Sequence, residues 1–275
     1  MQKIFIFLMF LVLLAPSAHA QKSGDLGVLG GVTYYVGDLN PGMPFRMAKP
    51  AFGILYRQNF NTRLALRAHF IRGTVAGDDA ISKANPERNL NFKSTISEAG
   101  LQFEINFFEY FIGSKMHSIT PYIFGGASVF FFNPYGNLPG GSVELQPLGT
   151  EGQGTAAYPD RKAYNLYAFS MPFGIGVKYS ISKLFGVGAE WGMRRTTTDY
   201  LDDVSQTYYL NLAGTVPANA TTKQLASDPL LTHNDGMQRG NSRNNDWYSF
   251  AGISLTVKIR MLSQEHCLDH QREGY

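Results

Sequence analysis

The segment "LQFEINF", Leu101 to Phe107, decides the fold class, because its apolar and polar residues alternate one by one. Its polar members, Gln102, Glu104 and Asn106, share one parity, and every residue of the other parity is apolar. Neighbouring side chains of a β-strand point to opposite faces of the sheet. The segment therefore predicts a strand with one apolar face and one polar face.

Alternating segments of this kind recur along the whole chain. The eight segments are residues 26–36, 52–56, 64–70, 101–107, 119–132, 169–179, 187–193 and 251–259. Segment 119–132 fits less cleanly, because it is apolar on both faces. The composition favours strands over helices, since the 275 residues include 29 glycines, 20 phenylalanines and 15 tyrosines. The sequence thus predicts an all-β fold.

The polar faces decide between a soluble β domain, with its apolar faces inside, and a membrane barrel, with its apolar faces outside. Single charges stand on these faces between Gly, Ser and Thr, which suits a narrow interior where opposite charges pair. Aromatic residues such as Tyr34, Phe107, Tyr179 and Trp247 lie near strand ends, as in the aromatic girdles of membrane barrels. The pattern therefore favours a closed antiparallel transmembrane β-barrel. Its predicted interior charges are Arg67, Glu104, Lys178, Glu190, Arg194 and Lys258.

The connections between the segments alternate in length. Outer-membrane barrels have short periplasmic turns, long external loops and an even number of strands. We therefore predict eight strands with both termini in the periplasm. Ten strands are the alternative, with residues 206–212 extending a further hairpin. Eight strands enclose room only for their own side chains or one small ligand, which disfavours a diffusion pore. The short connections are 61–63, 108–118 and 182–184, and the long ones are 37–50, 75–95, 133–163 and 198–245.

The sequence divides into three parts. Residues 1–20 have the pattern of a secretory signal peptide, with Lys3, an apolar core from Ile4 to Leu14 and small residues before the cleavage site. Residues 21–262 form the barrel, and residues 263–275 form a polar tail in the periplasm. The predicted location is the bacterial outer membrane, surrounded by its lipids. The net charge of +3 without a basic block predicts no nucleic-acid partner.

Three carboxylates follow the seventh segment within "RRTTTDYLDDVS", residues 194–205. Asp199, Asp202 and Asp203 fit a hydrogen-bonded loop, a cation site or an acid–base pair. Asp and Asn residues at loop bases commonly accept backbone N–H bonds, whereas three carboxylates supply only part of the six or more oxygens that calcium takes. We predict that they organise the external loop. Asp38 and Asn40 in "GDLN", residues 37–40, receive the same interpretation.

The sequence predicts no catalytic residue, no cofactor-binding residue and no metal ligand. His69, His117 and His233 have no serine and carboxylate that the sequence can place within hydrogen-bond reach. Cys267 is the single cysteine, so the chain has no internal disulfide. The two histidines near it are a weak metal signal. A lone cysteine in an oxidising compartment predicts either an intermolecular bond or an idle thiol.

Four stretches are distinctive: "YYVGDLN" (34–40), "YRQNFNTRLALR" (56–67), "TTTDYLDDVS" (196–205) and "NDWYSFAGISLTVKIR" (245–260). Together they resemble one known family, the PorG-type outer-membrane barrels associated with the type IX secretion system. That resemblance implies a non-enzymatic barrel that ties a periplasmic ring, built from a lipoprotein and its partner subunit, to the outer membrane. The contact surface would then be the short turns and the tail, with Cys267 as a candidate for a disulfide to the ring lipoprotein. The alternative is a stand-alone barrel that binds a small ligand or stabilises the envelope.

Overall fold

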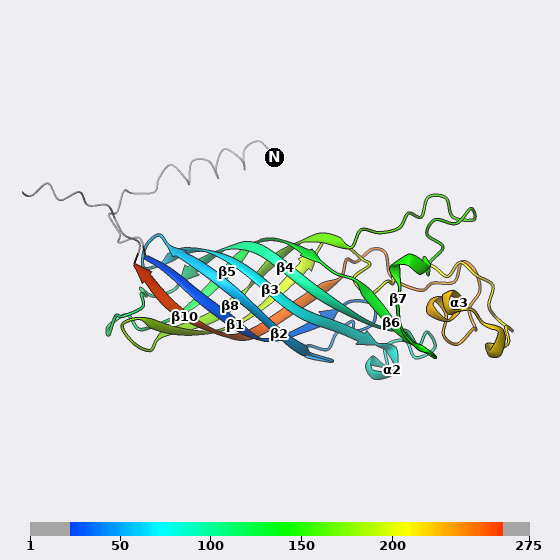
Figure 1. The fold of residues 1–275 in the computed structure, drawn as a ribbon, viewed down its shortest axis with the longest axis horizontal. Coiled ribbons are helices and arrows are strands. Elements are labelled where there is room, and N and C mark those ends of the chain that lie inside the picture. Colours follow the sequence, from blue (N-terminus) through cyan, green and yellow to red (C-terminus); the bar gives the residue numbers. More distant parts are fainter. Residues whose placement is uncertain (1–22, 261–275) are drawn as a thin grey trace, which may run out of the picture.

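The computed structural model describes residues 23–260, which form one antiparallel barrel with connections at its two ends (Figure 1). The predicted signal peptide and the tail with Cys267 lie outside the described residues. The barrel has eight strands, as the sequence predicts. They are β1 (Ser23–Val36), β2 (Lys49–Asn59), β3 (Leu64–Asp78), β4 (Asn91–Asn106), β5 (Ile119–Phe131), β8 (Tyr167–Ser180), β9 (Phe185–Thr196) and β10 (Trp247–Arg260).

The barrel is closed, because each of these strands pairs with two neighbours and the last strand pairs with the first. The β1–β10 ladder runs from the Ser23–Arg260 pair to the Val36–Trp247 pair. Backbone N–H and C=O groups of the wall therefore find partners within the sheet, which a lipid environment requires. The same ladder puts both ends of the described chain beside the short connections, at the left of Figure 1.

The outer surface of the wall is apolar. On β4, Leu101 and Phe103 point outward and are 55% and 60% exposed, whereas Gln102 and Glu104 point inward and are fully buried. The same arrangement holds around the barrel, with exposed residues such as Ile175 on β8 and Ile253 on β10. A continuous apolar exterior of this size is stable in lipid and not in water. The chain is thus a membrane barrel of the outer-membrane type.

The polarity of the wall reverses toward the long loops. In the first half of β4, Phe92 and Ile96 point inward and are buried, whereas Lys93 and Thr95 point outward and are exposed. On this upper part the barrel packs like a soluble protein, with an apolar interior and a polar exterior. The reversal lies near Ser97, beyond which the outward residues of β4 are apolar. The upper barrel therefore extends beyond the hydrocarbon layer.

This reversal explains one error and one ambiguity in the sequence-based prediction. Residues 75–95 do not form one loop, because β3 continues to Asp78 and β4 begins at Asn91. At the reversal the apolar residues change from one face of the strand to the other, so a search for one continuous alternating pattern stops before the strand ends. Segment 119–132, which forms β5, is apolar on both faces partly for the same reason, and partly because Tyr122 and Phe124 pack against Lys178 and Arg67 in the interior. Its outward residues face lipid, whereas Phe130 and Phe132 point into the apolar upper interior.

The long connections contain further short elements. Residues 133–163 are not a plain loop, because strands β6 (Pro134–Leu138) and β7 (Gly141–Glu144) form a hairpin that pairs with the upper end of β4. The ten-stranded alternative is wrong, since residues 206–212 contain a single isolated bridge, Thr207 to Gln238, and no strand. Among the described helices, none has the length and apolar character needed to cross a membrane. The helical elements are α2 (Asp79–Ser82), η1 (Gln146–Leu148), η2 (Pro217–Asn219) and α3 (Thr222–Ser227).

Candidate functional site

A network of buried charges, which we call the Glu104 network, fills the barrel near the short connections. Glu104 accepts hydrogen bonds from Arg57 Nε at 2.6 Å and from Lys178 Nζ at 2.5 Å. Arg67 Nε lies 3.3 Å from the same carboxylate, and the Arg67 guanidinium also pairs with Glu190. Three cations and three carboxylates balance one another, as buried charges must. The members are Asp25, Arg57, Arg67, Glu104, Lys178 and Glu190.

A second cluster, the Glu98 network, lies farther along the interior toward the loops. Glu98 is 2.7 Å from His69 Nε2 and 3.2 Å from Arg194 Nε, and it accepts a hydrogen bond from the Tyr248 hydroxyl at 2.9 Å. All four side chains are buried. The contact with Glu98 gives His69 a structural partner in the barrel interior.

Five of the six interior charges named in the sequence analysis belong to these two networks. The sixth, Lys258, lies at the mouth near the short connections, where its Nζ donates to the Ile112 carbonyl at 3.2 Å. Sequence reasoning missed Asp25, Arg57 and Glu98. Each has the polar parity of its strand, so extending the alternating segments by one residue for Asp25 and Arg57, and by three for Glu98, would have found them.

Apolar side chains fill the space that the charges leave. Gly174 and Gly192 make room for the Phe124 ring, since a Cβ atom at either glycine would lie within 2.7 Å of Phe124 Cζ. Above the Glu98 network, a cluster of buried apolar residues closes the barrel toward the loops. A filled interior of this kind leaves no continuous aqueous lumen through the described residues. The cluster includes Tyr35, Leu39, Val75, Leu90, Phe92, Ile96, Phe130, Phe132, Leu145, Leu201, Val204 and Tyr248.

The connection 107–118 closes the opposite mouth. Tyr110 and Ile112 are buried there, and the Tyr110 amide donates to the Thr62 carbonyl at 3.0 Å. Beside them remains a cavity of about 240 Å³, which Asn59 and Lys258 help to line. Side chains from the short connections thus cover this end of the barrel.

Two of the predicted loop carboxylates lie in buried hydrogen-bonded clusters. The Tyr35 hydroxyl is 2.5 Å from Asp202 and 2.8 Å from Asp246. One phenolic hydrogen cannot serve both acceptors, so a proton held by one carboxyl completes the arrangement. Burial and the negative charge of Asp246 raise the pKa of Asp202 well above its usual range. The backbone amides of Leu201 and Val204 donate to this pair, which fixes the turn. Sequence reasoning missed Asp246, because a carboxylate before an aromatic strand carries no distinct signal.

Asp203 holds the neighbouring part of the loops together. It accepts hydrogen bonds from Thr150 at 2.5 Å and from the Tyr164 hydroxyl at 2.7 Å. Burial raises its pKa to about 6, despite the nearby Arg239 guanidinium. Arg239 pairs with Glu151 at 3.0 Å, so one arginine links three loop segments. Nothing in the sequence pairs residues this far apart, and the contacts of Glu151 and Arg239 could not be predicted.

The other predicted loop residues are placed differently. Asn40 donates to the Tyr35 carbonyl at 2.7 Å, and Asp38 accepts from the Asn241 amide at 2.8 Å. Asp199 is half-buried, and one of its carboxylate oxygens has no hydrogen-bond partner among residues 23–260. Burial raises the Asp199 pKa to about 7. The Tyr35 hydroxyl contacts Asp202 and Asp246 and not Asp199, although burial and the negative charge of Asp199 together raise the pKa of Asp246 well above its usual range.

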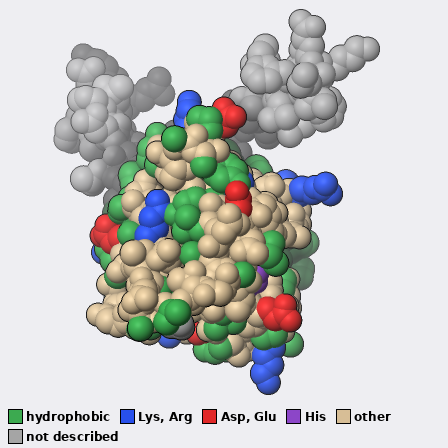
Figure 2. Space-filling model, turned by 90° about the vertical axis from the view of Figure 1, so that its right-hand side faces the viewer, with side chains coloured by type: hydrophobic (Ala, Val, Ile, Leu, Met, Phe, Trp, Pro, Cys, Tyr) green, Lys and Arg blue, Asp and Glu red, His purple; other side chains and the backbone are tan. Residues whose placement is uncertain are grey.

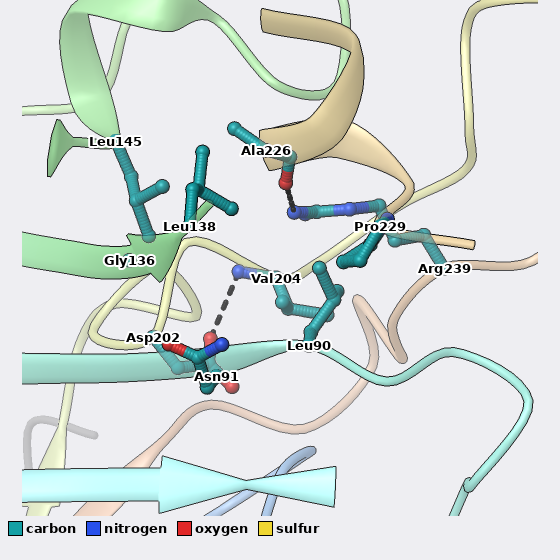
Figure 3. Close-up of a pocket in the computed structure, with 10 residues that line it drawn as sticks. All are labelled: Leu90, Asn91, Gly136, Leu138, Leu145, Asp202, Val204, Ala226, Pro229 and Arg239. Atoms are coloured by element: carbon teal, nitrogen blue, oxygen red, sulfur yellow. Dashed lines mark hydrogen bonds between the residues drawn. The ribbon is translucent and has the colours of Figure 1, made fainter. Parts of the chain in front are cut away.

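A water-sized cavity, of about 10 Å³, lies in the loop interior between Leu90, Leu145 and Arg239 (Figure 3). Figure 2 shows the loop end face-on, with mostly uncharged side chains and isolated charged groups. Within residues 23–260, no three His, Cys, Asp or Glu side chains are grouped so that they could hold a metal ion. The loop carboxylates thus make protein contacts and form no recognisable cation site.

Comparisons with known proteins give one family and several structural likenesses. Residues 2–139 match the family described as "Domain of unknown function (DUF6089)", which is half of the chain. No curated protein matches the sequence. Among solved structures, Ail of Yersinia pestis has 8% identity and a TM-score of 0.42 over 87% of this chain and 99% of its own. Neisserial surface protein A has 10% identity and a TM-score of 0.38 over 86% and 97%. OprG of Pseudomonas aeruginosa has 12% identity and a TM-score of 0.35 over 88% and 99%. TM-scores this low bear on neither ligands nor partners.

Proposed function

The chain belongs to the DUF6089 family, and we propose that it is a non-enzymatic membrane anchor for a periplasmic assembly. The filled interior carries this proposal. Buried ion pairs and packed aromatic rings occupy the space that a pore or an internal ligand would need. The surface of the barrel is then the part that is left to bind a partner.

The surface formed by the short connections supports a docking role. Connection 107–118 is hydrogen-bonded to its neighbours, through Tyr110 to Thr62 and through the Gly113 amide to Ser180 Oγ at 2.9 Å. On this continuous surface, Phe108 is 60% exposed and Met116 is 89% exposed. Exposed aromatic and methionine side chains are enriched where proteins bind one another. We call this surface the short-turn face.

The resemblance to PorG-type barrels suggests the partner. On that basis the short-turn face lies in the periplasm and contacts a ring made of a lipoprotein and its partner subunit. Residues 263–275 follow β10 in the sequence, and on the same basis we propose that Cys267 forms a disulfide with the ring lipoprotein. The proposed cellular location is the bacterial outer membrane.

The test is purification of the tagged full-length chain from its native envelope, in mild detergent and without reductant. We expect stoichiometric recovery of a periplasmic lipoprotein, and a mass shift in non-reducing electrophoresis that Cys267→Ser removes. The double variant Phe108→Asp/Met116→Asp should lose the lipoprotein. The control Met237→Asp changes a residue that is 46% exposed in the opposite loops, and it should retain the lipoprotein. Recovery of the barrel alone would contradict the anchor role and favour a stand-alone envelope barrel.

A further inference from the structure

A cavity of about 530 Å³ lies at the loop end of the barrel, outside the packed loop interior. It is bounded by the connection after β1, by residues 241–245, and by the ends of β9 and β10. Arg195 and Arg243 line it, together with Trp247 and three asparagines. The proposed docking face lies at the opposite end of the barrel, so this cavity is independent of the proposed function.

The two arginines of the cavity differ from the other described arginines. Arg194 points inward to Glu98, whereas its neighbour Arg195 has the outward parity of β9 and is exposed. Among the arginines whose side chains the structure describes, Arg195 and Arg243 alone donate no side-chain hydrogen bond and join no ion pair. The cavity also contains Asp38, whose carboxylate already accepts the Asn241 amide. Among the described residues, the cavity therefore holds two guanidinium groups without a side-chain partner and one carboxylate that already accepts a hydrogen bond.

The residues around the cavity indicate that it lies at the edge of the lipid layer. Arg195 is the first charged residue on the outward face of β9, after Trp191 and Met193. Its partner in the β8 ladder is Met171, which is outward and 51% exposed. Trp247 packs edge-on against Phe173, with ring centroids 6.0 Å apart. Tryptophan concentrates at membrane–water interfaces, where one side of the ring is apolar and the other is wet.

We propose that this cavity binds the phosphate of a lipid headgroup in the leaflet nearest the long loops. A guanidinium group offers two parallel N–H donors that match the oxygens of a phosphate. The side-chain amide of Asn244 also lines the cavity and adds a neutral donor, whereas that of Asn245 already donates to the Thr196 carbonyl at 3.1 Å. Trp247 and Phe173 provide an apolar surface for the acyl chain below the headgroup. A lipid meets both the charged and the apolar part of the site, whereas free phosphate meets only the charged part.

The two tryptophans of the chain, Trp191 and Trp247, make the proposal measurable. In the Trp191→Phe background, Trp247 is the single tryptophan, and it lines the cavity. The full-length protein is reconstituted in nanodiscs of phosphatidylcholine with a minor fraction of phosphatidic acid, and bromine atoms are placed on the acyl chains of one lipid at a time. We expect brominated phosphatidic acid to quench Trp247 as if enriched on the order of tenfold over its bulk fraction, because each basic side chain near a membrane attracts anionic groups.

Variants then distinguish binding at this cavity from a general attraction of anionic lipid to exposed basic side chains. Arg195→Gln/Arg243→Gln should remove the enrichment. Arg72→Gln should keep it, since Arg72 is also outward and exposed but donates to Ser97 Oγ and does not line the cavity. Folding of each variant is checked by the altered electrophoretic mobility of unheated barrels. Quenching by each brominated lipid in proportion to its bulk fraction, or enrichment that survives in the double variant, would overturn the proposal. If inorganic phosphate displaced the quenching lipid at concentrations too low to screen charge, the site would be one for soluble phosphate, and the lipid assignment would be wrong.

Discussion

Replacing Glu104 with glutamine tests whether the buried charges hold the barrel together. Glu104 is fully buried, and its carboxylate contacts Arg57, Arg67 and Lys178. The amide keeps the shape of the side chain and removes one negative charge. Three buried cations would then face only Asp25 and Glu190. Removing one partner from a buried ion pair typically costs about 3–5 kcal/mol, because the remaining charge is uncompensated.

The expected effect of Glu104→Gln is therefore a loss of about 3 kcal/mol or more in the free energy of unfolding. Urea titration in phospholipid vesicles, followed by the mobility of unheated samples on gels, measures it. Glu109→Gln is the matched control, because Glu109 is 48% exposed on its side chain and lies 3.6 Å from His117. Exposed pairs of this kind contribute at most about 1 kcal/mol.

A second substitution distinguishes charge balance from packing. Lys178→Met in the Glu104→Gln background removes one excess cation and keeps a long apolar side chain. The double variant should recover part of the lost stability. Glu104→Gln within about 1 kcal/mol of the wild type, or a double variant less stable than either single one, would refute the reasoning.

Three further predictions concern the wall and the loops. Leu101→Lys places a charge on the lipid-facing part of β4 and should reduce the free energy of unfolding by roughly 2–4 kcal/mol, whereas Thr95→Lys on the upper part should cost less than about 1 kcal/mol in the same titration. The pKa of Asp203 is raised to about 6 from an ordinary 3.8, so between these pH values the folded loops bind more protons than the unfolded loops. The stability of the loops is therefore greatest below about pH 4 and falls as the pH rises through 6. Limited proteolysis of the loops should accordingly be slower at pH 5 than at pH 8, and Asp203→Asn should reduce this difference; an unchanged difference would assign it to other groups. Tyr35→Phe removes the hydroxyl between Asp202 and Asp246, and hydrogen exchange at Leu201 and Val204 should accelerate by about tenfold or more, as expected for loss of a buried hydrogen bond; unchanged exchange would mean that the hydroxyl does not fix this turn.

The wall of the barrel could be predicted from the sequence, because lipid imposes one simple rule on every strand. Segment 101–107 alternates over its whole length, and the structure places its residues as that alternation predicts. Prediction failed where the surroundings change within one strand. Above Ser97 the outward face meets water, and the apolar residues of β4 move to the inward face.

The loop clusters were only partly predictable for a different reason. Asp and Asn residues near strand ends indicate turns, and this placed Asp202 and Asp203 in the external loops. Their partners are distant in the sequence, because Asp246 lies 44 positions beyond Asp202 and Thr150 lies 53 positions before Asp203. Local patterns carry no information on such pairs. The contacts depend on how the loops fold over the barrel.

The most direct test of the account measures the surroundings of β4 residue by residue. Single cysteines are introduced from 93 to 105 in the Cys267→Ser background and labelled with a nitroxide in lipid vesicles. Collision rates with oxygen report contact with lipid, and those with a water-soluble nickel complex report contact with water. We predict oxygen contact at the odd positions from 99 to 105, nickel contact at 93 and 95, and low collision rates for both reagents at the even positions. Low oxygen contact at Leu101, Phe103 and Ile105 would show that these residues do not face lipid, and the membrane barrel would be wrong.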